Sequence, residues 1–173
     1  MNKNSISRKI TTGAIVAAMY IAINYIQELI IPSSSSMLIQ IRIAEALMLL
    51  ATISPEIIGG LTIGCLISNI INVGVIPMDI IIGTLATFIS CVLAYKFRNI
   101  KFYSIPVLSS FMPVIINSVF IGCELQFFFI KGEFQIGILL AQIGIIAIGE
   151  FISSVLLGIP VYKLISKLNI IKN

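Results

Sequence analysis

The sequence predicts an all-α integral membrane protein, folded as one bundle of six transmembrane helices over residues 1–173. Apolar residues make up 58% of the chain and charged residues only 10%, with a mean hydropathy of +1.12. A soluble domain needs about a quarter charged residues to cover its surface. The apolar residues are also gathered into stretches close to the roughly 20 residues that cross a bilayer, and the length allows about six of them.

The first three helices are bounded by turn-forming residues. Pro32 and the serine run after it end the first apolar stretch. Ser54-Pro55-Glu56 starts the third helix, because serine caps a helix, proline fits its first turn and a carboxylate favours the positive end of its dipole. Gly74 ends that helix. We therefore expect helices over about 10–31, 38–53 and 55–73.

The last three helices have similar boundaries. Pro77-Met78-Asp79 starts the fourth helix, which ends before a basic segment. Lys131-Gly132-Glu133 has the composition of a turn between the fifth and the sixth. These signals predict helices over about 78–95, 103–129 and 135–165, with neither an internal repeat nor an interdomain linker.

The basic residues predict the orientation. Six spans would bring nine of the 11 basic residues to one side, in three clusters: Lys3, Arg8 and Lys9; Lys96, Arg98 and Lys101; and Lys163, Lys167 and Lys172. Cytoplasmic loops are rich in lysine and arginine. Both termini are therefore expected to be cytoplasmic. The basic residues form no single aromatic-laced surface, so no nucleic-acid partner is expected.

Polar side chains concentrate near the opposite, outer side. They are Asn24, Gln27, Glu28, Gln40, Arg42, Glu45, Asn69, Asn72, Asp79, Asn117, Glu124, Gln126 and Gln142, with Glu150 somewhat deeper. An ionisable side chain at the centre of a transmembrane helix costs at least about 2.5–3.5 kcal/mol, so each needs a reason. A polar cavity open to the outside is the simplest account.

Some of these residues have a structural explanation. Arg42 and Glu45 are spaced i,i+3 and could pair with each other. Asp79 could belong to a helix start. Glu124 and Glu150 resist such explanations, because neither lies at a predicted helix end and no lysine or arginine shares its span. A functional role is expected for both.

The sequence lacks the residues that several kinds of enzyme and metal site require. There is no histidine, and hence no HExxH motif, and Asp79 is the single aspartate, where an intramembrane aspartyl protease needs two. No GxSxG or P-loop motif occurs, so any ATP-driven step needs a partner. Cys65, Cys91 and Cys123 lie in apolar stretches without a CxxC pair, which favours buried packing thiols over metal ligands.

A stripe of small residues marks the first helix. Ala14, Ala18 and Ala22 recur every four residues, a pattern that permits close helix approach. It could serve a partner protein or packing within the chain. Gly60 and Gly64 of the third helix are expected to serve internal packing.

The stretch Ile39–Leu47 resembles the Q-x-R-x-[SA]-E-A-L signature of the QueT family, the substrate-binding (S) components of energy-coupling factor (ECF) transporters for queuosine precursors. The similarity continues in order along the chain. It includes Gly59–Asn69, Asp79, Gly83–Thr87, Pro113, Asn117, Gly122–Leu125, Gly149-Glu150 and Leu157–Pro160. Essentially the whole chain from the first helix onward is covered, although the first loop is longer and richer in serine than the family's.

This resemblance implies a six-helix S component in the cell membrane of a prokaryote. Such a subunit captures its ligand from outside and associates with a transmembrane coupling protein and two ABC-type ATPases, which use the ATP; no cofactor is implied in this chain. The resemblance further implies that the small-residue stripe faces the coupling protein. It places the ligand near the outer face, between the first loop and helices four to six, and suggests that the loaded subunit topples in the membrane.

The ligand hypothesis is a 7-deazaguanine: preQ1, preQ0 or queuine. One carboxylate can accept both donors of a guanine-like edge, the ring carbonyl needs a donor, and the aminomethyl cation of preQ1 needs a second carboxylate. The candidates are Glu124 and Glu150 for the carboxylates, in either role, and Asn117 and Gln142 for the carbonyl. Gln40, Arg42, Glu45 and Asp79 are further site candidates, and Phe120, Phe127, Phe128 or Tyr25 could stack on the ring.

Three alternatives stay open at this point. The chain could be an S component for another vitamin or nucleobase, because S components share a fold and differ in ligand. It could be a solitary carrier driven by an ion gradient through its buried carboxylates. It could also be a membrane scaffold that binds no small molecule.

Overall fold

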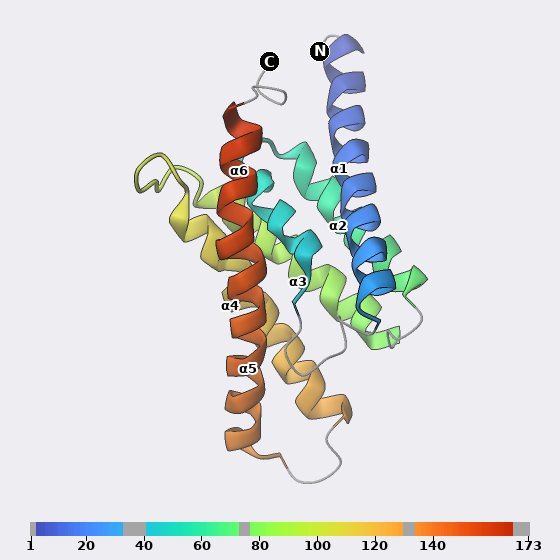
Figure 1. Cartoon of the computed structure of the whole chain (residues 1–173), viewed down its shortest axis with the longest axis vertical. Helices are drawn as coiled ribbons and strands as arrows, with labels where there is room; N and C mark the ends of the chain where they lie inside the picture. Colours follow the sequence, from blue (N-terminus) through green and yellow to red (C-terminus); the bar gives the residue numbers. More distant parts are fainter. Residues whose placement is uncertain (1–2, 33–40, 73–76, 130–133, 168–173) are drawn as a thin grey trace.

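The computed structural model describes residues 3–32, 41–72, 77–129 and 134–167, and within these ranges the protein is all-helical, without a β-strand (Figure 1). The serine run, Gly74, the Lys131–Glu133 turn and Gln40 lie outside these ranges. The elements in order are α1 (Lys3–Ile30), η2 (Ile43–Thr52), α2 (Glu56–Ile71), α3 (Pro77–Lys96), α4 (Val107–Glu124), η3 (Leu125–Phe129), α5 (Ile136–Glu150), η4 (Phe151–Leu157) and α6 (Gly158–Lys167).

Within the described ranges, four continuous helices are long and apolar enough to cross a membrane. They cover Ile6–Ile30, Pro77–Lys96, Val107–Phe128 and Ile136–Lys167. The last one joins α5, η4 and α6 into 32 residues, or about 48 Å at 1.5 Å per residue, longer than the hydrocarbon core of about 30 Å. The predicted integral membrane fold is thus confirmed at this level, while Ile43–Thr52 and Glu56–Ile71 are shorter apolar helices.

The second predicted helix differs most from expectation. The sequence pattern suggested an ordinary helix from residue 38, whereas the structure has a ten-residue 3₁₀ helix that begins at Ile43 after an extended Arg42. Because 3₁₀ geometry rises about 2.0 Å per residue, η2 reaches about 20 Å where an α-helix of equal length would reach about 15 Å. All its residues from Ala44 to Thr52 are buried. It is therefore a core element enclosed by the longer helices.

The start of α1 and the end of α6 lie at the same end of the molecule (Figure 1). The connection between α3 and α4 is in the same half of the view, whereas the end of η3 and the start of α5 lie at the opposite end. The basic residues of α1, of the α3–α4 connection and of α6 thus lie in one half of the molecule, while Lys172 lies outside the described residues. The side of the membrane that this half faces stays a prediction.

The apolar core surrounds η2 and includes Tyr20, Met48, Leu50, Ile57 and Leu61. Close contact between α1 and α2 depends on the two glycines predicted to serve packing. A Cβ on Gly60 would collide with the backbone of Gly13, and one on Gly64 would lie 3.0 Å from Cβ of Tyr20. That prediction is confirmed.

The alanine stripe lies on the other side of α1. Ala14, Ala18 and Ala22 are all exposed, so none is used for packing against the described part of the bundle. The cysteines follow the packing expectation more closely, with Cys65 and Cys91 buried and Cys123 half-buried, all three as free thiols.

Candidate functional site

Four buried polar side chains, two from each half of the chain, form one cluster. We call Arg42, Glu45, Asn117 and Glu150 the inner cluster; they lie at the start of η2, in η2, in α4 and at the end of α5. Each has 7% or less of its surface exposed, and Glu45 has none. Such a group among apolar helices needs internal partners to be tolerated.

The start of η2 is held by neighbouring side chains. The Gln27 amide donates to the carbonyl of Ile41 and accepts from the backbone N–H of Ile43 at 2.7 Å. The N–H of Arg42 donates to Oγ of Ser153 in η4 at 3.1 Å. Side chains of α1 and η4 therefore hold the backbone around Arg42, although both elements are distant from it in the sequence.

Arg42 and Glu45 form the predicted i,i+3 pair, with 3.8 Å between Nη1 and Oε1. That prediction is confirmed, but the distance is too long for a hydrogen bond. This ion pair therefore leaves hydrogen-bonding atoms of both side chains without a close partner in the pair.

Asn117 connects the two carboxylates of the inner cluster. Its Nδ2 donates to Oε2 of Glu45 at 2.8 Å and to Oε1 of Glu150 at 3.1 Å. Its Oδ1 accepts from the hydroxyl of Ser90 at 3.3 Å, which orients the amide. One amide thus brings together two carboxylates that like-charge repulsion would otherwise separate.

Three polar atoms of the inner cluster keep unused bonding capacity. Nε of Arg42, Oε1 of Glu45 and Oε2 of Glu150 are buried without a hydrogen bond to an amide, hydroxyl or carbonyl group of any described residue, while the carboxyl groups of Glu45 and Glu150 lie within hydrogen-bonding range of each other. Leaving such atoms unpaired costs about 1–3 kcal/mol each, so native proteins keep few of them. The three atoms form a set of one donor and two acceptors that a ligand could satisfy.

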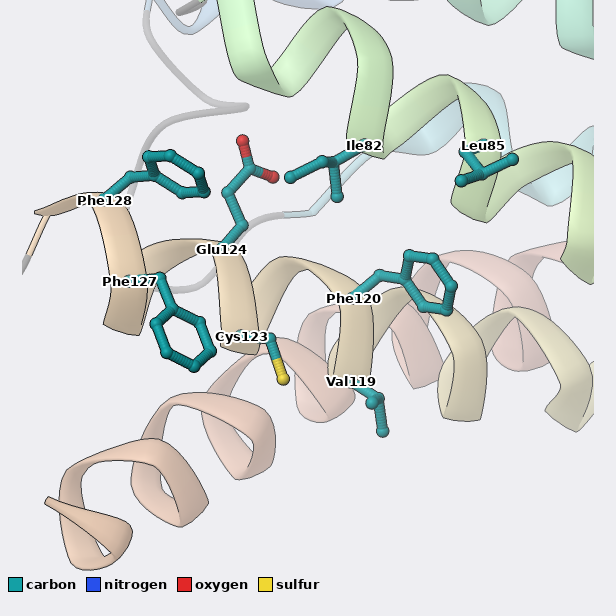
Figure 2. A pocket seen from close by; sticks show the side chains of 8 residues that line it. All are labelled: Ile82, Leu85, Val119, Phe120, Cys123, Glu124, Phe127 and Phe128. Carbon is teal, nitrogen blue, oxygen red and sulfur yellow. The ribbon is translucent and has the colours of Figure 1, made fainter. Parts of the chain in front are cut away.

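A second feature, the Glu124 groove, lies between α3 and α4 with η3 at one end. It has a volume of about 340 Å³, within the usual range for small-molecule sites. Its lining is apolar apart from one carboxylate: Ile82, Leu85, Val119, Phe120, Cys123, Glu124, Phe127 and Phe128 (Figure 2). Glu124 extends from α4 toward α3, and its carboxylate lies between Ile82 and Phe128 (Figure 2).

Glu124 is 2% exposed, and neither of its oxygens accepts a hydrogen bond from a described donor by geometry. Its hydrogen-bonding neighbour is the carboxyl group of Asp79, and the guanidinium of Arg42, which also acts on Glu150, interacts with it electrostatically. Arg42 packs on α3 as well, because a Cβ on Gly83 would lie 3.8 Å from its Nη1. The inner cluster and the groove are therefore electrostatically connected through Arg42.

Each of the two glutamates immediately precedes a π-helical turn. Glu124 ends α4 before η3, and Glu150 ends α5 before η4. Such turns are rare and are frequently found at functional sites. The sequence analysis expected uninterrupted helices here. The available signal was Ser153-Ser154, whose hydroxyls bond back to the carbonyls of Gly149 and Glu150 four residues earlier.

The predicted site residues are thus divided between two places. Arg42, Glu45, Asn117 and Glu150 belong to the inner cluster; Glu124, Asp79, Phe120, Phe127 and Phe128 belong to the groove or its edge. Gln142 is half-buried on α5 with an unpaired Oε1, Tyr25 is exposed on α1, and Gln40 lies outside the described residues. The sequence analysis missed Ser90 and Ser153, whose only signal was a hydroxyl in an apolar helix.

The comparisons with known proteins complete this description. The family model described as the QueT transporter matches residues 10–167. The same chain gives no match among curated proteins and none among solved structures. With four helices of membrane-spanning length and a match over most of its residues, the chain is an integral membrane protein that belongs to the QueT transporter family.

Proposed function

We propose that the chain is the substrate-binding subunit of an ECF-type importer that captures a queuosine precursor from outside the cell. The precursor would be a 7-deazaguanine such as preQ1, preQ0 or queuine. Membership of the QueT transporter family supports this proposal. The structural observation that carries it is the inner cluster, where Asn117 holds Glu45 and Glu150 together.

The unpaired atoms of the inner cluster match the edge of a guanine-like ring. Oε1 of Glu45 and Oε2 of Glu150 would accept from N1–H and the exocyclic amine of the ring, and Nε of Arg42 would donate to its carbonyl. This refines the initial assignment, since Arg42 takes the carbonyl role first considered for Asn117 and Gln142. Asn117 would instead position the two carboxylates.

The topology of the proposed subunit has six spans and cytoplasmic termini. Both termini share one end of the molecule with the basic α3–α4 connection (Figure 1), as the positive-inside rule requires of a cytoplasmic side. The start of η2, which carries Arg42, lies at the end of η2 away from the termini (Figure 1). Ligand would therefore enter from the outer side.

Delivery would depend on partner proteins. The exposed stripe Ala14, Ala18 and Ala22 would contact a transmembrane coupling protein, and two ABC-type ATPases would hydrolyse ATP. The chain would act as a transport subunit without a cofactor, and would topple with its ligand instead of opening a channel.

Calorimetry on the purified full chain in detergent tests the proposal. We expect wild type to bind at least one of preQ1, preQ0 and queuine, and Glu150→Gln to weaken binding about tenfold or more through loss of a charge-assisted contact. Glu56→Gln is the matched control, because Glu56 is half-buried in the first turn of α2, outside the inner cluster. Unchanged affinity in Glu150→Gln and Glu45→Gln would refute the assignment.

Uptake into liposomes separates the importer from the solitary carrier. The importer requires the coupling protein and ATPases for uptake. Accumulation by this chain alone under an ion gradient would instead identify an ion-driven carrier.

A further inference from the structure

Glu124 is a buried carboxylate that makes no contact in the proposed recognition of the ring edge. It is 2% exposed and it lines the groove, and in the part of the chain that the structure describes its oxygens accept no hydrogen bond from an amide, hydroxyl or guanidinium group. Its hydrogen-bonding neighbour is another carboxyl group, that of Asp79. Inserting such a group into an apolar wall costs free energy unless something pairs with it. A ligand that brings its own donors would remove that cost.

The charges around Glu124 favour a cationic ligand. Asp79 of α3 places a second carboxyl group beside it, and ionised carboxylates at close range repel each other. Arg42 is the basic partner that acts on Glu124, and it also serves Glu45 and Glu150. Among the described residues, three carboxyl groups thus lie in the field of one guanidinium, those of Glu45, Glu124 and Glu150, and this arrangement favours a ligand that brings a further positive charge.

The walls of the groove suit a small cation as well. Phe128 lies beside the Glu124 carboxylate, and Phe120 and Phe127 line the same groove (Figure 2). An ammonium group is attracted by the face of an aromatic ring within about 6 Å. Apolar walls also strengthen the attraction between the ammonium and the carboxylate, because they exclude water.

Arg42 connects the groove with the inner cluster. The guanidinium of Arg42 packs against Gly83, one helical turn after Asp79, and interacts electrostatically with both Glu124 and Glu150. A ring held at the inner cluster would therefore have its neighbouring substituent directed along α3 toward Glu124.

We propose that the Glu124 groove is an ammonium site, which selects a deazaguanine that carries a protonated aminomethyl group over one that carries a neutral substituent. This inference rests on the proposed function, since the ring must be bound at the inner cluster. It assigns Glu124 as the specificity-determining residue, with Asp79 and the phenylalanines in support.

The test compares preQ1 with preQ0, which share the ring and differ in an aminomethyl group against a nitrile. Calorimetry on the purified full chain should show that wild type binds preQ1 about tenfold or more tightly than preQ0. Glu124→Gln, which keeps the shape of the side chain, should abolish most of that preference by weakening preQ1 while changing preQ0 about twofold or less. Glu124→Asp should keep part of the preference, and Glu56→Gln all of it.

The outcomes separate this inference from the proposed function. If preQ1 and preQ0 bind wild type equally, or if Glu124→Gln weakens both to the same degree, the ammonium site is refuted while the deazaguanine function stands. If neither compound nor queuine binds, the proposed function fails and the inference with it. Thermal unfolding of each variant shows whether it is folded, and Asp79→Asn, expected to weaken preQ1 selectively, provides a second variant if Glu124→Gln does not fold.

Discussion

Glu150 and Glu124 are both buried glutamates that end an α-helical segment just before a π-helical turn, but their surroundings differ. Glu150 accepts a hydrogen bond from Asn117, which also holds Glu45. Glu124 lines an apolar groove, where its hydrogen-bonding neighbour is another carboxyl group, that of Asp79, and no amide among the described residues donates to it. We therefore expect the inner cluster to contribute to the stability of the fold, and the carboxylate of Glu124 to contribute less and to serve the proposed ligand.

The largest expected effect is at Asn117, because it supports both carboxylates of the inner cluster. Asn117→Leu should lower the free energy of unfolding by about 3 kcal/mol or more, since two hydrogen bonds to charged groups are lost together. Thermal unfolding in detergent, followed by labelling of the buried thiols Cys65 and Cys91, measures it. Ile115→Leu on the exposed face of the same helix is the control. A loss no greater than in this control would show that the amide does not hold the cluster together.

Glu150→Leu should have a smaller effect of the same sign. One hydrogen bond from Asn117 is removed, but the repulsion between Glu150 and Glu45 is removed as well, so we expect a loss of about 1–2 kcal/mol. The same thiol-labelling measurement applies, with Ile148→Leu as an exposed control two residues away. Stabilisation by Glu150→Leu would mean that the inner cluster, like the groove, is maintained for binding alone.

Glu124→Leu should not lower the free energy of unfolding, in contrast to the two substitutions above. Removing a buried carboxylate that repels the neighbouring carboxyl group of Asp79 should leave the free energy of unfolding unchanged or raise it by about 1 kcal/mol, while selectivity for preQ1 is lost. Unfolding and calorimetry on one preparation check both parts. A clear destabilisation would contradict the comparison, because it would show that Glu124 is as structural as Glu150.

Ala18→Leu should change neither region. Ala18 is exposed on α1, so ligand affinity and thermal stability should equal those of wild type. Co-purification with the coupling protein should nevertheless be lost, because the added bulk prevents close helix approach. Survival of the complex would exclude this face of α1 as the interface.

Local patterns in the sequence were enough for the helices and for contacts within one turn. Hydropathy and the turn residues predicted where the helical segments lie, apart from the later start and 3₁₀ form of η2, since apolar length and backbone propensity are local properties. The i,i+3 spacing predicted the Arg42–Glu45 pair. The composition and order of the motifs likewise indicated the family that the comparison found.

Only the tertiary structure decided how the polar side chains are grouped. The bond from Asn117 to Glu45 spans 72 positions and the bond from Arg42 to Ser153 spans 111, so both depend on how the helices are rotated against one another. The 3₁₀ form of η2 and the π turns after Glu124 and Glu150 arise from packing as well, because local propensity favours an α-helix in each place. The sequence pattern predicted one pocket, whereas the structure has an inner cluster and a separate groove. A sequence pattern specifies which side chains lie along a helix, but the packing of the helices decides which neighbours those side chains meet.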